Sequence, residues 1–260
     1  MRRFTVGALI AVVMWVTPAF AITSGQPDEG RHPEVGALVG TFEGETYPYC
    51  SGALISPTVF LTAAHCDIDE AVDGDPVTVT FEERYTSRAK LHRGNFYAHP
   101  EAWHDSADAK DIAVVVFRRP IKGIQPAQLP TEGLLDEMSA NGTLTQSTRF
   151  TSVGYGSTGF TNQPGGPAPT YPDARMFAVG SFNSLNSYWL RLSMNEAHDD
   201  GGTCYGDSGG PNYLGAGANE TDIIVGTTIT GDVLCKSTNV TYRTDTDSAR
   251  AFLARFVTLP

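Results

Sequence analysis

Residues 206–211 read Gly-Asp-Ser-Gly-Gly-Pro, and this stretch carries the clearest chemical signal in the chain. Glycines on both sides of Ser208 let the backbone turn tightly and present the serine hydroxyl together with neighbouring amide groups. A hydroxyl beside unpaired amides is the arrangement of a nucleophile on an anion-binding site. The same residue types also make ordinary turns, so a catalytic interpretation requires partners elsewhere in the chain.

Two upstream motifs supply such partners. His65 stands in residues 62–66, which read Thr-Ala-Ala-His-Cys, and Asp111 directly precedes the apolar run 112–117. A serine hydroxyl is a weak nucleophile near neutral pH until an imidazole accepts its proton, and a carboxylate holds that imidazole in the required tautomer. The sequence therefore predicts a triad of His65, Asp111 and Ser208, with Asp111 preferred to Asp108 because only Asp111 opens an apolar strand.

In this order, the three motifs resemble those of the chymotrypsin-fold, trypsin-like serine endopeptidases, and the resemblance extends over nearly all of the chain after residue 21. It implies an all-β fold of two antiparallel six-stranded β-barrels with a C-terminal helix. It also implies an oxyanion hole made by the amides of Gly206 and Ser208. Protein or peptide substrates are expected, with no cofactor and no metal.

The N-terminus has the composition of an export signal, with Arg2 and Arg3 before an apolar run at 6–16 and an Ala-Phe-Ala ending at 19–21. The apolar run is shorter than the roughly 20 residues that a spanning helix needs, which favours a signal peptide over a membrane anchor. Cleavage after Ala21 would release a secreted protein beginning at Ile22. The resemblance implies that the freed Ile22 amine pairs with Asp207, so that signal cleavage itself would activate the enzyme.

Four cysteines suit an exported protein and allow two disulfides in three connectivities. The resemblance implies that Cys50 pairs with Cys66 and that Cys204 pairs with Cys235. The chain has no Cys-x-x-Cys spacing, which is the pattern that would favour a zinc site. A calcium site is also not expected, because the acidic residues after His65 lack the spacing of an EF-hand loop; these are Asp67, Asp69, Glu70, Asp73 and Asp75.

The formal net charge is −11, and it becomes −13 without residues 1–21, which carry two arginines and no acid. Such a surface disfavours nucleic acid and anionic membranes as partners, and we expect a monomer. Short runs between turn signals predict strands; they lie at 35–39, 53–55, 77–81, 112–117, 150–153, 176–179, 188–192 and 223–229. Only 248–257 reads as a helix, capped by Asp245 or Asp247.

These elements predict a first barrel at about 22–130, a second at about 145–245 and a terminal helix at about 246–258. Residues 120–142 show little periodicity and resemble the connector between the family's barrels. The stretch 161–172 is rich in proline and glycine, which predicts a surface loop without a strand ladder.

Specificity follows from the resemblance. Counting back from Ser208, the floor of the substrate pocket falls on Gly202, followed by Thr203, and Gly231 keeps the mouth of the pocket open. Without a carboxylate at the floor, an apolar P1 residue is expected. Cleavage after Arg or Lys remains an alternative, because a shift of the loop could bring Asp199 or Asp200 to the pocket.

One position departs from the family pattern. Ile229 replaces a serine that usually binds the triad acid, unless a shifted register lets Thr228 do so. A second family glycine falls near Asn239 or Val240, and a valine there would shorten the pocket. With Ile229 in place of the serine, Asp111 would lose one hydrogen-bond partner, and the sequence does not determine the catalytic efficiency that results.

Two other functions remain as alternatives. A non-catalytic homologue that binds protein through the same cleft is one, although all three triad residues are intact. A lipase or esterase is the other, since 206–210 fits Gly-x-Ser-x-Gly, but that fold requires the order Ser, Asp, His and a helix after the serine.

The histidines other than His65 lack the spacing of metal ligands, and we expect them to face solvent or to be hydrogen-bonded within the protein; they are His32, His92, His99, His104 and His198. N-glycosylation sequons stand at Asn141, Asn219 and Asn239.

Overall fold

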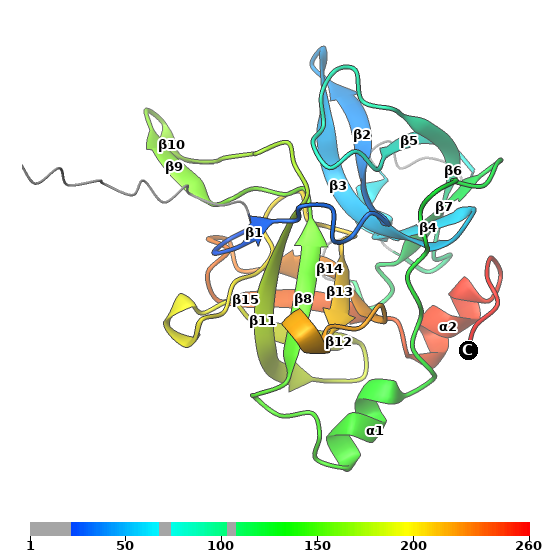
Figure 1. The fold of residues 1–260 in the computed structure, drawn as a ribbon, viewed down its shortest axis with the longest axis vertical. Helices are drawn as coiled ribbons and strands as arrows, with labels where there is room; N and C mark the ends of the chain where they lie inside the picture. The colour runs from blue at the N-terminus through cyan, green and yellow to red at the C-terminus, as the bar shows by residue number, and fades with distance from the viewer. Residues whose placement is uncertain (1–21, 68–73, 103–107) are drawn as a thin grey trace, which may run out of the picture.

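The computed structural model describes residues 22–67, 74–102 and 108–260. The predicted signal peptide, His104 and the acidic residues at 69, 70 and 73 therefore lie outside the described residues. Figure 1 shows two β-barrels packed against each other, with the C-terminal helix beside them. Within the described residues, no helix is long and apolar enough to cross a membrane.

The first barrel is closed by six antiparallel strands in the order β2-β3-β4-β7-β6-β5. These strands are β2 (Val35–Phe42), β3 (Glu45–Ser56), β4 (Val59–Thr62), β5 (Pro76–Thr80), β6 (His92–Ala98) and β7 (Ala113–Phe117). Their inward faces are apolar, and Leu38, Leu54 and Phe60 are completely buried. The barrel interior is thus filled by side chains rather than left as a channel.

In the second barrel the order is β11-β12-β15-β14-β13-β8, and β8 pairs with β11 to close it. The strands are β8 (Arg149–Gly154), β11 (Met176–Leu185), β12 (Trp189–Ser193), β13 (Pro211–Leu214), β14 (Ile224–Gly231) and β15 (Thr238–Arg243). The short β1 (Gln26–Pro27) adds to β11 at the outside. Two six-stranded antiparallel barrels and a C-terminal helix confirm the predicted fold class.

Four barrel strands escaped the sequence prediction, namely β4, β6, β13 and β15, and β13 and β15 carry polar residues inward. Asn239 on β15 is completely buried, and its amide donates to Asn212 Oδ1 on β13 at 2.9 Å. The Asn212 amide in turn donates to Thr228 Oγ1 at 3.0 Å. Hydrogen bonding makes these polar side chains tolerable inside the barrel, and burial takes Asn239 out of reach of glycosylation.

Two helices lie outside the barrels. The α1 helix (Leu134–Ala140) lies in the predicted connector 120–142 between the two barrels, and the prediction that only 248–257 is helical was wrong. Its start depends on a distant residue, because the Leu135 N–H donates to Asp245 Oδ2 at 2.8 Å. The α2 helix (Asp247–Leu253) is capped by Thr246, whose hydroxyl accepts from the Ala249 N–H, and not by either predicted aspartate.

The proline- and glycine-rich stretch is also a correction, since it forms a hairpin. Strands β9 (Phe160–Gln163) and β10 (Gly166–Pro169) pair antiparallel beside the second barrel (Figure 1). Pro167 and Pro169 are two positions apart, so both missing N–H groups fall on the same edge of β10 and leave the other edge able to pair.

A buried charge cluster ties the N-terminal segment to both barrels. Asp28 is fully buried and accepts hydrogen bonds from the His32 ring and from Arg175 Nε, the latter at 2.8 Å. The other His32 nitrogen lies 2.7 Å from Glu220 Oε1. Burial alone would lower the pKa of His32, but its bonds with Asp28 and Glu220 raise that pKa to about 9. His32 is therefore a charged imidazolium at neutral pH, and the prediction of a satisfied histidine holds for it.

This cluster predicts an alkaline loss of stability. Because the pKa of His32 rises from 6.5 to about 9 on folding, its contribution is complete below about pH 6.5 and is lost as the pH rises through 9. The free energy of unfolding should fall by up to about 3 kcal/mol across that range. Denaturant titrations of the wild type and His32→Gln at a series of pH values measure it. A variant whose pH dependence in this window equals that of the wild type would contradict the assignment.

Candidate active site

His65 and Asp111 are placed by adjacent strands of the first barrel. His65 lies in the 3-10 turn Ala64–Cys66 that follows β4, and Asp111 lies just before β7, which pairs with β4. The His65 Nδ1 atom is 2.6 Å from Asp111 Oδ2, and the His65 backbone N–H donates to Asp111 Oδ1 at 3.0 Å. Asp111 is 1% exposed, so its carboxylate fixes both the position and the tautomer of the ring.

Ser208 lies in a tight turn before β13, on the second barrel. Gly206 in this turn has φ of 96°, a left-handed conformation that favours glycine. Among the described residues, the N–H groups of Gly206 and Ser208 donate to no protein acceptor. These two amides are available to an external anion, as the oxyanion-hole prediction requires.

One residue that the sequence interpretation missed holds this turn against the first barrel. Ser51 on β3 is completely buried and donates its backbone N–H to the Ser208 carbonyl at 2.7 Å. Its hydroxyl donates to the Gly206 carbonyl at 3.0 Å and accepts from the Tyr155 N–H at 2.9 Å. The only sequence signal was its place beside Cys50.

His65 and Ser208 line one cavity of about 360 Å³ between the barrels. Its other walls come from the segment before Ser208, the end of β14 and the residues that follow β14; they include Thr203, Tyr205, Ile229, Gly231 and Asp232. Within the described residues, no hydrogen bond joins the Ser208 hydroxyl to the His65 ring. Such bonds are often long without substrate, so the shared cavity is the relevant geometry.

Thr203 and Gly231 line this cavity, but Gly202 does not. Gly202 is buried, and a Cβ built on it would overlap the side chain of Met194. Met194 is itself completely buried and packs against Cys204 and Cys235, both of which line the cavity. The thioether of Met194 thus fills the space behind the cavity floor, a role that no motif indicated.

The two aspartates considered for basic specificity point elsewhere. Asp200 is 1% exposed, lies 2.9 Å from Arg149 Nη1 and accepts from the Ser181 hydroxyl. Asp199 is exposed and is not part of the cavity lining. The carboxylate that does line the cavity is Asp232, near its rim, whose oxygens accept backbone N–H groups of residues 236–238.

The departure at Ile229 has a structural counterpart. Ile229 is 1% exposed, belongs to the apolar core and is one of the residues along the cavity. Thr228 does not replace the missing serine, because its hydroxyl accepts from the Asn212 amide instead. Among the described residues, Asp111 accepts hydrogen bonds from His65 alone. Within this part of the chain, the predicted triad acid therefore has a single hydrogen-bonding neighbour that orients it.

Asp207 is a completely buried carboxylate without a cation. Within the described residues it accepts only the N–H groups of Gly156 and Cys204, at 2.8 and 2.9 Å. Burial raises the pKa of Asp207 to about 7, although the two backbone bonds oppose that rise. Ile22 is also completely buried, but it packs with Ala174, Met176 and Ala178, and no ion pair joins it to Asp207.

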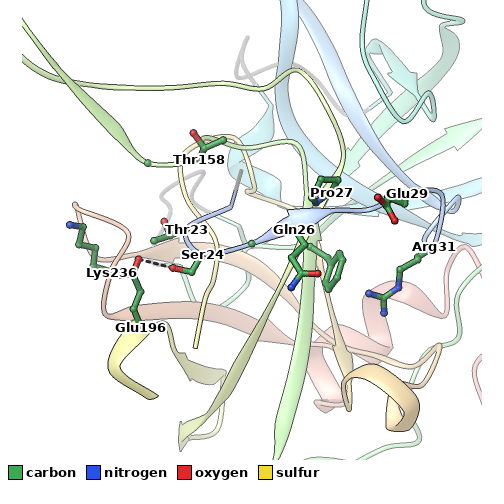
Figure 2. Close-up of a pocket in the computed structure, with 12 residues that line it drawn as sticks. Thr23, Ser24, Gln26, Pro27, Glu29, Arg31, Thr158, Glu196 and Lys236 are labelled. Carbon is green, nitrogen blue, oxygen red and sulfur yellow. Dashed lines mark hydrogen bonds between the residues drawn. The ribbon is translucent and has the colours of Figure 1, made fainter. Parts of the chain in front are cut away.

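A larger cavity of about 790 Å³ follows the N-terminal segment and does not include His65 or Ser208 in its lining. Figure 2 shows Thr23, Ser24 and Gln26 along this cavity, with Glu196 and Lys236 across from them. The Ser24 hydroxyl donates to Glu196 Oε1 at 2.6 Å. This cavity borders the residues that follow the predicted cleavage point.

Both disulfides flank the site. Cys50 bonds to Cys66 beside His65, and Cys204 bonds to Cys235 in the cavity wall. Cys50, His65 and Cys66 also lie close enough together to suggest a metal site. Their sulfurs are bonded to each other, so no thiolate is available as a ligand.

Two closed barrels with a cavity at their junction are the architecture of chymotrypsin-type proteins. Residues 24–252 match the protein family described as Trypsin. Among related proteins, the chain is 28% identical to a trypsin of Phaedon cochleariae over 182 residues, which cover 66% of each chain. It is 27% identical to a trypsin of Saccharopolyspora erythraea over 69% of this chain and 75% of that one. A tryptase of Mus musculus is 27% identical over 63% of this chain and 62% of its own.

The chain belongs to the trypsin family, which places it among the serine endopeptidases. The matched segment spans about two thirds of the length of the Phaedon trypsin. Membership agrees with the two disulfides and with protein substrates.

The packing of Met194 against Gly202 predicts a stability effect. Gly202→Ala should lower the free energy of unfolding by about 1–3 kcal/mol, because the added methyl group overpacks a filled space. The double variant Gly202→Ala with Met194→Ala should be less destabilised than the sum of the two single variants, since the methyl enters the vacated volume. Denaturant unfolding of all four proteins gives the coupling. Additive losses would contradict the contact.

Proposed function

We propose that the mature chain, residues 22–260, is a secreted, monomeric serine endopeptidase that acts through His65, Asp111 and Ser208. The observation that carries the proposal is the 2.6 Å contact of His65 with buried Asp111, on the same cavity as Ser208. No metal or organic cofactor takes part. The strongly negative net charge supports polypeptide rather than nucleic acid as the ligand.

In this mechanism the Ser208 Oγ attacks the carbonyl carbon of the scissile peptide bond while His65 Nε2 accepts the hydroxyl proton. Asp111 keeps the proton on Nδ1 and stabilises the imidazolium that forms. The Gly206 and Ser208 amides bind the oxyanion of the tetrahedral intermediate, a contribution worth about 3 kcal/mol per donor in related chemistry. His65 then protonates the leaving amine, and water attacks the acyl-enzyme by the same steps in reverse order.

The cavity supports an apolar P1 residue of moderate size. The residues along it include Thr203, Ile229 and the Cys204–Cys235 disulfide, against which Met194 packs. An Arg or Lys side chain would lose hydration there without gaining a buried counter-ion. Asp232 lies at the rim and is partly exposed, so its charge acts on residues beside P1 rather than on P1 itself.

Hydrolysis of a peptide library varied at P1, by protein that begins at Ile22, tests this function. We expect cleavage after Phe, Tyr, Leu or smaller apolar residues, and loss of activity by a factor on the order of 10⁶ in Ser208→Ala. Cleavage after Arg or Lys would overturn the specificity. A correctly processed, folded protein without any activity would instead favour a binding homologue.

Activation is proposed to follow from removal of residues 1–21. In a chain that still contains Ala21, the Ile22 nitrogen belongs to a peptide bond and carries no charge. Cleavage creates an ammonium, and the buried, cation-free Asp207 is the group that such a charge would stabilise. An ion pair would order the turn that presents the Gly206 and Ser208 amides.

Protein with one alanine retained before Ile22 should fold but lose at least about a hundredfold in kcat/KM, since the oxyanion donors are not ordered. The pKa of its Asp207 should remain near 7, above the ordinary 3.8, so this group's contribution to stability is complete below about pH 4 and is lost as the pH rises through 7. The correctly processed enzyme should lack this slope. Asp207→Asn in the alanine-extended protein should remove it as well.

Equal activity of the extended and the correctly processed proteins would contradict the activation proposal. A matched control is an alanine insertion after Gly44, an exposed turn between β2 and β3, where added length leaves the N-terminus unchanged.

A further inference from the structure

A basic groove lies on the first barrel, at the end of β7 away from Asp111. The β6 and β7 strands are antiparallel with Gly94 opposite Phe117, so Arg93 on β6 and Arg118, which directly follows β7, lie at the same end of this strand pair. With His92, Phe117, Arg119 and Ile121 they line a cavity of about 290 Å³. We call this the 93/118 groove.

The arginines of the 93/118 groove have no acidic partners. Arg93, Arg118 and Arg119 are all exposed, and none forms an ion pair within the part of the chain that the structure describes. Arg149, Arg175 and Arg243, by contrast, each contact a buried aspartate. In a chain with a net charge of −11, unpaired cations gathered at one groove are a segregated positive site.

One further positive charge, that of Lys90, lies near the groove. Burial and the nearby charge of Lys90 lower the pKa of His92, while Glu82 is the acid that acts in the opposite direction. Lys90 is exposed and, within the described residues, unpaired. The lowered pKa leaves His92 neutral near pH 7, so it adds an apolar ring edge rather than charge, beside Phe81 and Phe117.

We propose that the 93/118 groove binds an acidic segment of the polypeptide substrate, away from the scissile bond. Three guanidinium groups suit carboxylates, which they bind in a bidentate manner, and the ring of Phe117 with Ile121 offers a floor to an aliphatic or aromatic neighbour. The substrate class is therefore a polypeptide that carries Asp or Glu next to an apolar residue. This inference rests on the proposed endopeptidase function.

Two arguments favour a short acidic segment over a long polyanion. The chain as a whole is net negative, with 29 acidic against 18 basic residues, and this overall charge would repel an extended nucleic acid or sulfated polysaccharide. The groove is also partly apolar. A sulfated polysaccharide would contact only the cationic side chains and would leave the apolar part of the groove unused. An acidic peptide uses both properties.

The position also suits one substrate that fills both sites. Asp111 stands before β7 and Arg118 follows it, so the two sites are about 20 Å apart at about 3.3 Å of rise per residue. A substrate would span this with about six to eight extended residues. The groove would raise affinity through effective concentration without touching the reacting atoms.

Binding to the Ser208→Ala protein tests the site without catalysis. The probe is a fluorescent peptide with four Glu residues flanking Leu and Phe, measured by anisotropy. Changing Arg93, Arg118 and Arg119 together to Glu should weaken binding at least about tenfold at low ionic strength, and salt should weaken wild-type binding. Arg255→Glu, which changes an exposed arginine that follows α2, is the matched control and should change binding less than about twofold.

Equal binding by the triple variant would overturn the proposal, as would tighter binding of a heparin fragment or an oligonucleotide than of the acidic peptide. Loss of catalysis in the wild type leaves this measurement intact, so failure of the proposed function and failure of the groove are distinguishable.

A kinetic arm then links the groove to turnover. For a substrate with the acidic segment about seven residues from the cleavage point, the triple variant should raise KM about tenfold with kcat unchanged. A short substrate without that segment should be cleaved equally by both proteins. An equal change for both substrates would point to a general structural effect and overturn the proposal.

Discussion

Ser51 makes the contacts on which the proposed catalytic arrangement depends. His65 and Asp111 belong to the first barrel and Ser208 to the second, so their relation is only as fixed as the junction of the barrels. Ser51 bonds to the carbonyls of Ser208 and Gly206 and to the Tyr155 amide, all of which lie on the second barrel. These bonds fix two carbonyls of the turn, while the Gly206 and Ser208 amides, which belong to other peptide units, donate to no acceptor among the described residues. A single buried serine thereby orients the turn that must carry both nucleophile and anion donors.

Charge at the same junction is distributed unevenly. Asp28, His32, Arg175 and Glu220 form a compact set in which each charge has an opposite partner. Asp207, by contrast, is equally buried and relies on two backbone amides. An unpaired charge in the interior raises the free energy of the folded state. The paired set therefore stabilises the fold, whereas an ionised Asp207 destabilises it. A proton or an incoming ammonium relieves that instability.

The architecture and most residues around the cavity were predicted from motifs that resemble those of a known family, and local signals supported that prediction. Apolar runs marked most strands, and glycines around Ser208 marked the turn. The sequence could not predict α1, since the first turn of that helix is capped by Asp245, which is far away in sequence. It also missed Met194 and Ser51, whose side chains matter through what they contact across the barrels. The strands that contain Asn212 and Asn239 were missed for a related reason. Polar residues that point inward interrupt the alternation of apolar and polar residues that identifies a strand.

The buried amides of the second barrel have a consequence for its folding. Asn239 on β15 donates to Asn212 on β13, which donates to Thr228 on β14, and Ser152 on β8 also donates to Asn212. Four strands are thus joined through one side chain. If β15 slipped by one residue, Val240 would turn inward and Asn239 outward, and Asn212 would lose a donor where no water replaces it. Apolar side chains of similar size tolerate such misalignment more readily than amides do. The hydrogen-bonded side chains around Asn212 therefore favour one alignment of the strands over others that would bury a comparable area of apolar surface.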